Sequence, residues 1–278
     1  MPTDSLETLL RDAEKEFELQ GRDVQDYVMA SSVILNTMGA EWWKKHALLD
    51  TNRADDFFRT SSNPEVSAEE CRQLRIIKLG HCLYALRRAA GFEDFVRALL
   101  TRDVEPAFFE LWAASILQDF GFTVRFVIPT GTKRSDYDLV LERDGVGICA
   151  EAKHRCPDEA PTGNALMNTL VKARRQLPED EPGIVLLSIP SAWTWIEEFE
   201  AMVAESLEKF FRSSGRVNVV GLFWEHWVQT EAGRGEAFFW REYFHPQPRA
   251  SIRLGSLATE TKSTFSGLSF RKYADAQR

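Results

Sequence analysis

The spacing of apolar residues divides the chain into a helical first part and a mixed second part. Over residues 1–100, apolar side chains recur every three or four positions, which is the spacing of amphipathic helices. The clearest set is Leu6, Leu9, Leu10, Ala13 and Phe17, and a looser set runs from Cys71 to Leu86. The pattern predicts an all-helical region over residues 1–100, in which residues 51–67 form a connecting loop.

From residue 101 the pattern alternates between helical and strand-like segments. An apolar stripe between Glu105 and Gly121 predicts a helix, and the apolar run from Gly183 to Ile189 is typical of a strand buried on both faces. The segments between them predict a strand at 123–128, a hairpin at 135–154 and a helix at 163–177. The segments after them predict a helix at 195–211, strands at 217–228 and 236–244, and an edge strand at 251–254. The predicted fold class is α/β (α+β), a mixed sheet flanked by helices in the order αβββαβ, which fills a domain over residues 101–278.

The hairpin is the most informative segment, because its turn decides which side chains face each other. Asp144-Gly145 is a dipeptide typical of a two-residue type I′ turn. If these two residues form the turn, every facing pair has residue numbers that sum to 289. Asp138 then faces Glu151, and Asp136 faces Lys153.

Strand alternation sorts the hairpin side chains onto two faces. One face is apolar or small and is expected to lie on a core: Tyr137, Leu139, Leu141, Ile148, Ala150 and Ala152. The other face carries Asp136, Asp138, Val140, Cys149, Glu151 and Lys153. Two facing carboxylates repel each other unless a cation lies between them, and a hard ion such as Mg²⁺ prefers oxygen ligands. The pattern therefore indicates a hydrolytic site for phosphate esters.

At these residues the chain resembles the restriction-endonuclease-like, or PD-(D/E)xK, nuclease superfamily. The resemblance rests on Asp138 and on Glu151-Ala152-Lys153, and it covers residues 105–190. Ser135-Asp136-Tyr137-Asp138 stands where many members have Pro-Asp, so the motif alone leaves the choice between Asp136 and Asp138 open. The facing-pair argument favours Asp138.

The resemblance implies a restriction-endonuclease-like core and a Mg²⁺-dependent nuclease that cuts nucleic acid, DNA before RNA, with Mn²⁺ as a substitute ion. The implied metal ligands are Asp138, Glu151 and the backbone carbonyl of Ala152, while Lys153 orients a water or stabilises developing charge. Superfamily members commonly have an acid on the helix before the first core strand, and Glu110 matches that position as a catalytic and metal-binding residue. The alternative for Glu110 is an acid near the helix start that favours the helix dipole.

Charge and composition bear on the partners and the compartment. The net charge of −8 argues against a polybasic binder, although residues 249–278 carry six Lys or Arg against two Asp or Glu. The candidate nucleic-acid contacts are Lys133, Arg134, Lys172 and Arg175. No apolar run approaches the roughly 20 residues of a membrane span, and the four cysteines show no CxxC spacing. We expect a cytoplasmic protein without a membrane partner, whose helical region is a candidate for binding DNA, another protein or a second copy in a homodimer.

Two alternatives to catalysis remain open. The first is a catalytically inactive module on the same fold that binds nucleic acid or a protein partner, because a fold does not determine a function. The second makes the charged side chains of the hairpin the solvated face of an ordinary surface element. The buried strand predicted at 183–189, with a helix predicted before and after it, argues against the second.

Overall fold

Two compact units make up the part of the chain that the computed structural model describes, namely residues 3–16, 22–47, 58, 66–128, 130–132, 134–156, 159–230, 233–250, 252 and 263–264. The helical unit comprises the described residues up to Arg88 together with Val96–Trp112. The sheet unit comprises Ala89–Phe95 together with the described residues of Ala113–Phe265. The domain boundary expected at residue 100 stays a prediction.

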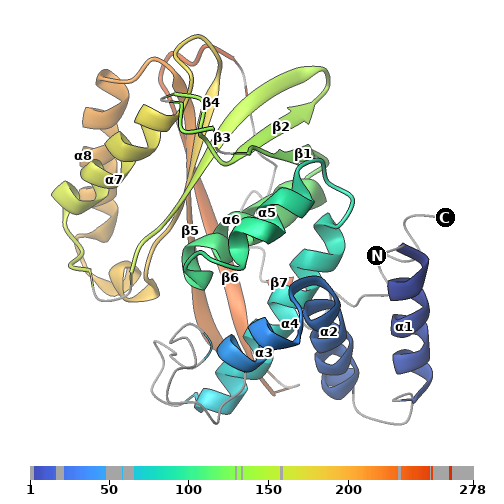
Figure 1. The fold of residues 1–278 in the computed structure, drawn as a ribbon. Helices are drawn as coiled ribbons and strands as arrows, with labels where there is room; N and C mark the ends of the chain where they lie inside the picture. The colour runs from blue at the N-terminus through green and yellow to red at the C-terminus, as the bar shows by residue number, and fades with distance from the viewer. Residues whose placement is uncertain are drawn as a thin grey trace. The chain divides into compact units, whose positions relative to one another are not determined.

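The helical unit confirms the all-helical region expected at the start of the chain (Figure 1). Its helices are α1 (Thr3–Glu16), α2 (Arg22–Met38), α3 (Ala40–His46) and α4 (Ala68–Leu86), and α5 (Phe92–Leu99) and α6 (Val104–Asp119) contribute residues to both units. Helix α4 begins at a capping box in which Ser67 and Glu70 satisfy each other's backbone N–H groups. Helices α2 and α4 pack closely, since a Cβ atom at Gly80 would lie 2.6 Å from Ala30. The predicted loop at 51–67 lies almost entirely outside the described residues.

The sheet unit is built on one mixed sheet, in which the described strands lie side by side in chain order. The strands are β1 (Thr123–Phe126), β2 (Leu139–Arg143), β3 (Val146–His154), β4 (Gly183–Ser188), β5 (Val217–Thr230), β6 (Gly233–Phe244) and β7 (Ser263–Thr264). The central pairs β3–β4 and β4–β5 are parallel, and the other pairs are antiparallel. The order α6, β1, β2, β3, α7, β4 is the αβββαβ order predicted from the sequence.

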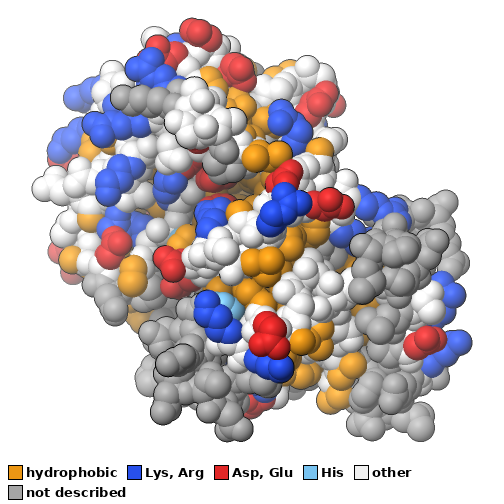
Figure 2. Space-filling view, viewed as in Figure 1, with side chains coloured by type: hydrophobic (Ala, Val, Ile, Leu, Met, Phe, Trp, Pro, Cys, Tyr) orange, Lys and Arg blue, Asp and Glu red, His pale blue; other side chains and the backbone are white. Residues whose placement is uncertain are grey.

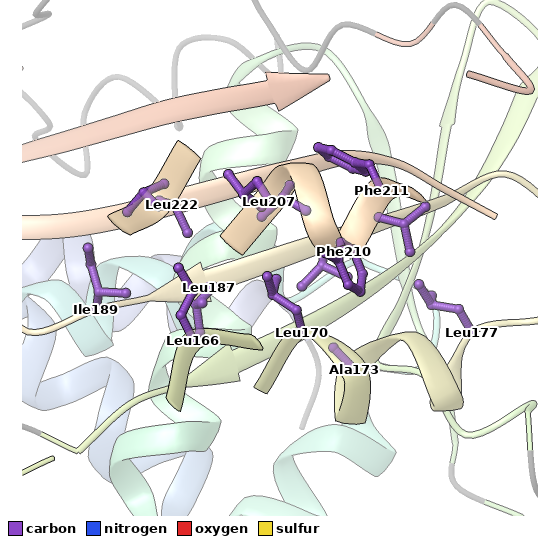
Figure 3. Packing of buried hydrophobic residues seen from close by; sticks show 14 of the residues in the cluster. Leu166, Leu170, Ala173, Leu177, Leu187, Ile189, Leu207, Phe210, Phe211 and Leu222 are labelled. Carbon is purple, nitrogen blue, oxygen red and sulfur yellow. The ribbon is translucent and has the colours of Figure 1, made fainter. Parts of the chain in front are cut away.

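Helices α7 (Gly163–Gln176) and α8 (Phe199–Arg212) cover one face of this sheet. Figure 3 shows the apolar stripe of α7 directed toward Leu187 of β4 and toward Leu207 and Phe210 of α8. The predicted stripe residues Leu166, Leu170, Ala173 and Leu177 are all buried in this cluster. The outer side of α7 is basic, whereas the outer side of α8 carries both acidic and basic residues. Figure 2 shows several Lys and Arg side chains at the left of the view, where these helices lie.

The opposite face of the sheet is buried as well. Ile184 and Leu186 of β4 and Val219 and Phe223 of β5 alternate with the residues that face α7 and α8, and none of the four is exposed. The expectation that this strand is buried on both faces is therefore confirmed. The edge strand expected at 251–254 falls outside the described residues except for Ile252. Among the described helices, none combines the length and apolar character needed to cross a bilayer.

Candidate functional site

The closed end of the motif hairpin has the geometry that its sequence predicts. Asp144 and Gly145 both have positive φ angles, 54° and 75°, as a type I′ turn requires. The ladder between β2 and β3 runs from Arg143↔Val146 to Leu139↔Ala150, and each of these pairs sums to 289. The predicted register is therefore confirmed along the whole of β2.

The open end of the hairpin departs from that register. Strand β2 begins at Leu139, and the N–H of Asp138 donates to the carbonyl of Ala150 at 3.2 Å instead of pairing with residue 151. The carbonyl of Asp138 in turn accepts from the N–H of Val127 at 3.0 Å. Asp138 is thus bonded to the chain on both sides, at the point where regular pairing with β3 stops.

The residues just before this point take unexpected places. Tyr137 packs against the core cluster beneath α7 and α8, and its hydroxyl interacts with the thiol of Cys149. The prediction that Tyr137 and Leu139 lie on the same face of the hairpin was wrong. Strand alternation does not extend past the start of β2, and Tyr137 lies on the face of Cys149. The carboxylate of Asp136 accepts from the N–H and hydroxyl of Thr130, at 2.7 and 3.0 Å. The predicted facing of Asp136 and Lys153 does not hold, since Asp136 belongs to this loop.

The Asp138 carboxylate reaches the strand that carries the Glu-x-Lys motif. Its Oδ2 atom accepts a hydrogen bond from the N–H of Ala152 at 2.8 Å. This N–H lies beyond the last pair of the β2–β3 ladder, so the side chain supplies the acceptor that a longer β2 would have provided. Asp138 therefore contacts the peptide unit that joins Glu151 to Ala152, although the ladder pair of Asp138 with Glu151 that the register predicts does not form.

Glu151 is fully buried, with 0% of its surface exposed, and Lys153 neutralises it. The Lys153 ammonium group contacts Oε1 of Glu151, and 28% of the lysine side chain remains exposed. Both side chains share a sheet face with Val185 and Leu187, their neighbours on β4, which belong to the core beneath α7 and α8. A carboxylate in such apolar surroundings is stable as an anion only beside a positive charge.

Arg155 holds the end of β3 in place, and the sequence analysis did not identify it. Its backbone N–H donates to the carbonyl of Ser188 at 3.1 Å, and its guanidinium donates to the carbonyl of Ala165 at 2.7 Å. The guanidinium also lies over the ring of Trp193, 5.1 Å from its centroid. Arg155 is buried and joins β3 to β4 and α7, which fixes the position of Lys153 two residues earlier. Only tertiary contacts distinguish it from a surface arginine.

A protonated cluster lies on the other side of Glu151 along β3. The thiol of Cys149 donates to Glu181 Oε2 at 3.0 Å. Burial, together with this hydrogen bond, raises the pKa of the Cys149 thiol to about 12. Burial and the contact with Cys149 likewise raise the pKa of Tyr137. Both groups are neutral at physiological pH, so they add no charge that competes with the carboxylates.

The remaining predicted site residues have other partners, are exposed, or fall outside the described residues. Glu110 belongs to the helical unit, where it is buried and ion-paired with Arg102. Arg134 is exposed and pairs with Glu179 at 2.9 Å. Lys172 and Arg175 are exposed on α7. Lys133 lies outside the described residues.

The donors at this site fit a hard divalent cation in chemical type. Asp138 is bonded to the peptide N–H of Ala152, the residue after Glu151, so two carboxylates and the carbonyl of Ala152 are the oxygen donors that this segment offers. Within the described part of the chain, no group of three or more His, Cys, Asp or Glu side chains is arranged to hold a metal. Mg²⁺ requires no such group, since it is often bound by one or two carboxylates and completes its shell with water.

Comparison with known proteins adds little to this description. No protein-family model matches the sequence, and no curated protein matches it either. Among solved structures, that of SfsA from Pyrococcus furiosus in complex with Ca²⁺ aligns with 14% sequence identity and a TM-score of 0.25. The alignment covers 47% of this chain and 60% of SfsA, so this chain spans less than two thirds of that protein. This similarity is too slight to inform function, which is inferred below from the geometry of the hairpin.

Proposed function

We propose that this protein is a divalent-cation-dependent nuclease of the PD-(D/E)xK type that hydrolyses phosphodiester bonds, with DNA as its substrate. The observation that carries the proposal is the 2.8 Å hydrogen bond from the Ala152 N–H to Asp138, because it brings the lone aspartate to the Glu-x-Lys strand. The αβββαβ order around this hairpin agrees with the core order of that superfamily. Glu151 is fully buried, which argues against the alternative that the charged side chains of the hairpin form an ordinary solvated surface.

Each residue of the site has a distinct role in this proposal. Asp138, Glu151 and the Ala152 carbonyl would hold Mg²⁺, with Mn²⁺ as a substitute. Such an ion, when bound, polarises the scissile phosphate and lowers the pKa of a bound water. Lys153 can move its ammonium group from Glu151 to the reacting water or to a phosphate oxygen, since part of its side chain is already exposed. The apolar packing around Glu151 keeps bulk water away from this carboxylate.

Contacts to the nucleic-acid backbone are proposed for the basic side chains outside the site. Lys172 and Arg175 are exposed on α7, the helix that covers the Glu151 face of the sheet. Arg134 belongs to the loop that leads into Asp138. Cations of this kind bind phosphates without regard to base identity, so their contribution should weaken as salt concentration rises. Lys133 stays a sequence-based candidate for the same role.

One observation favours the alternative of an inactive binding module. The ammonium of Lys153 already neutralises the charge of Glu151, so that charge needs no metal ion for compensation. In that case the motif would stabilise the hairpin, and the basic surface of α7 alone would contact nucleic acid or another partner. The two functions differ in their dependence on divalent ions.

The test is a cleavage assay on the purified full chain with single-stranded, double-stranded and branched DNA and with RNA, in Mg²⁺, Mn²⁺ or EDTA. We expect ion-dependent cleavage that Asp138→Asn and Glu151→Gln each reduce by more than about 100-fold. Loss of a residue that only supports a metal ligand already costs about 10–100-fold, and these variants change the proposed ligands themselves. Asp144→Asn is the matched control, since it changes a carboxylate of the same hairpin to a residue that the type I′ turn favours. Undiminished cleavage by either site variant refutes the ligand assignment. A mobility shift without degradation, insensitive to metal, supports the binding module.

A further inference from the structure

Trp195 is an aromatic side chain held in solvent at one end of the sheet unit. It is the last residue of the short 3₁₀ helix η2 (Ser191–Trp195), which follows β4, and it is 67% exposed. Isolated exposed apolar residues are common and need no explanation by themselves. Trp195 differs from such residues because the structure around it is tightly fixed.

The neighbours of Trp195 in the chain are anchored on both sides. Trp193 is buried, and its indole N–H donates to the carbonyl of Glu159 at 3.0 Å. The hydroxyl of Thr194 donates to the carbonyl of Ser191 at 2.7 Å. On the far side, the N–H of Ile196 bonds to the carbonyl of Trp193 at 3.3 Å. The exposure of Trp195 is therefore a fixed feature of the fold.

Trp195 is also the outermost member of a row of aromatic rings. It stacks on His226 with ring centroids 5.7 Å apart and an interplanar angle of 13°. Thr194 holds this imidazole at 3.2 Å, and burial lowers the pKa of His226, so the ring is neutral at physiological pH. His226 packs edge-on against Phe239, which stacks on Trp224 at 6.0 Å. The row supports the indole from below and leaves its outer surface to solvent.

The row lies on the same sheet face as the candidate site. Lys153 pairs with Leu187, and Leu187 pairs with Leu222 of β5, so these three side chains point to one face. His226 follows Leu222 by an even number of residues and therefore shares that face. Two strand spacings and four residues of rise separate Lys153 from His226, which gives about 16 Å between their Cα atoms. A single strand of nucleic acid spans such a distance with a few nucleotides.

We propose that Trp195, supported by His226, is a stacking platform for one unpaired nucleobase of the strand whose phosphodiester lies at Glu151 and Lys153. The inference rests on the proposed function and specifies its substrate as single-stranded or locally unpaired nucleic acid. A flat, exposed indole stacks on any base, because every base presents a π-face. The residues that follow Trp195 include the exposed Glu197 and Glu198, which repel phosphate. The platform therefore adds stacking and no backbone contact.

The test measures binding of a labelled single-stranded oligonucleotide and of a duplex of equal length by fluorescence anisotropy. All proteins in this assay are full chains that also carry Glu151→Gln, so that the oligonucleotide is not cleaved while Mg²⁺ is present. The chain with Glu151→Gln alone is the parent protein. Trp195→Ala should weaken single-strand binding by about 10-fold, within the range measured for loss of one base stack, with the salt dependence unchanged. Trp195→Phe should restore most of the affinity, and duplex binding should not change. Phe244→Ala, which removes another exposed aromatic of the same sheet, should have no effect.

A second measurement is the fluorescence of 2-aminopurine, a base analogue placed at successive positions of the oligonucleotide. One position should be quenched on binding, and Trp195→Ala should remove that quenching. If the parent protein binds single strands but Trp195→Ala binds them equally well, the platform is refuted and the nuclease proposal stands. An equal loss from Phe244→Ala also refutes the platform. If the wild-type protein neither binds nor cleaves any nucleic acid, the proposed function fails and the platform fails with it.

Discussion

The helical unit and the sheet unit each bury a glutamate beside a cation, and the two pairs are built differently. In the helical unit, Arg102 places two guanidinium nitrogens on the two carboxylate oxygens of Glu110, one of them at 2.9 Å. In the sheet unit, Lys153 places a single ammonium on one oxygen of Glu151. Glu110 and Glu151 are both buried, so burial alone does not distinguish a structural carboxylate from a functional one.

The cation makes the difference. A guanidinium fork matches both carboxylate oxygens and keeps its charge at any physiological pH, so the Arg102–Glu110 pair is complete as it stands. An ammonium is a point charge on a flexible stem, and Lys153 can turn toward solvent without any change in the backbone. This contrast favours a structural role for Glu110 and an exchangeable partner for Glu151. The predicted part of Glu110 in metal binding stays a prediction.

The largest expected effect concerns the Lys153–Glu151 pair. Lys153→Ala removes the ammonium that contacts a fully buried carboxylate, which should lower the free energy of unfolding by about 3 kcal/mol. A divalent ion can take over that charge, so saturating Mg²⁺ or Ca²⁺ should restore most of the loss. Thermal unfolding in EDTA and in each ion measures both quantities.

Arg102→Ala is the matched control, because it removes the cation from the other buried glutamate. It should lower stability by about 1–2 kcal/mol, less than Lys153→Ala because both side chains of this pair are more exposed than those of Lys153 and Glu151. Added ions should not restore the loss. An ion response in Arg102→Ala as large as that in Lys153→Ala would remove the distinction between the two pairs. It would also revive Glu110 as a metal ligand.

A smaller effect should distinguish the two units by their response to acid. His81 is buried in α4, and this burial lowers its pKa to about 4. The unfolded chain takes up a proton near pH 6.5, whereas the folded protein does not, so stability present above pH 6.5 is lost as the pH falls toward 4. We expect a loss of about 2 kcal/mol between pH 7 and pH 5, measured by urea unfolding.

His81→Leu should flatten this pH dependence. His226→Gln, in the sheet unit, should leave most of this pH dependence in place. Burial lowers the pKa of His226 too, but His226 is more exposed than His81, so its contribution should be smaller. If His81→Leu and the wild-type chain lose stability equally over this range, acid sensitivity does not come from the helical unit.

The parts of the structure that follow local rules could be predicted from the sequence. The type I′ turn at Asp144-Gly145 determines the register along β2, and the stripe from Leu166 to Leu177 predicts the face of α7 that packs on the sheet. The register brings Asp138 near the Glu-x-Lys strand, but the bond from its side chain to the Ala152 N–H forms where regular pairing has stopped. These features depend on residues that are close in sequence or related by one turn.

The parts that could not be predicted depend on tertiary contacts between distant segments. Hydrogen bonds from Val127 to Asp138 and from Thr130 to Asp136 change the course of the backbone just before β2. No local sequence pattern indicates these bonds. Arg102 gave no sign of its pairing with Glu110, since it precedes α6 and lies eight residues away. The fixed exposure of Trp195 likewise arises from anchors at Trp193 and Thr194. The candidate site could therefore be proposed from the sequence, whereas the contacts that support it could not.

The smallest expected effect tests whether the Glu151 pair depends on the closed end of its hairpin. Gly145 has a φ of +75°, and a Cβ atom there would meet no atom within 4 Å, so Gly145→Ala should cost about 1 kcal/mol from backbone strain alone. Gly121→Ala is the matched control, since Gly121 has a φ of +84°, open space around it and no place in the hairpin. Both variants should lose similar stability in chemical denaturation, and both should keep the stabilisation by Ca²⁺ that the proposed site at Glu151 is expected to give. Loss of that stabilisation in Gly145→Ala alone would mean that the turn holds the two acids together, because a one-residue slip would carry Glu151 to the opposite face.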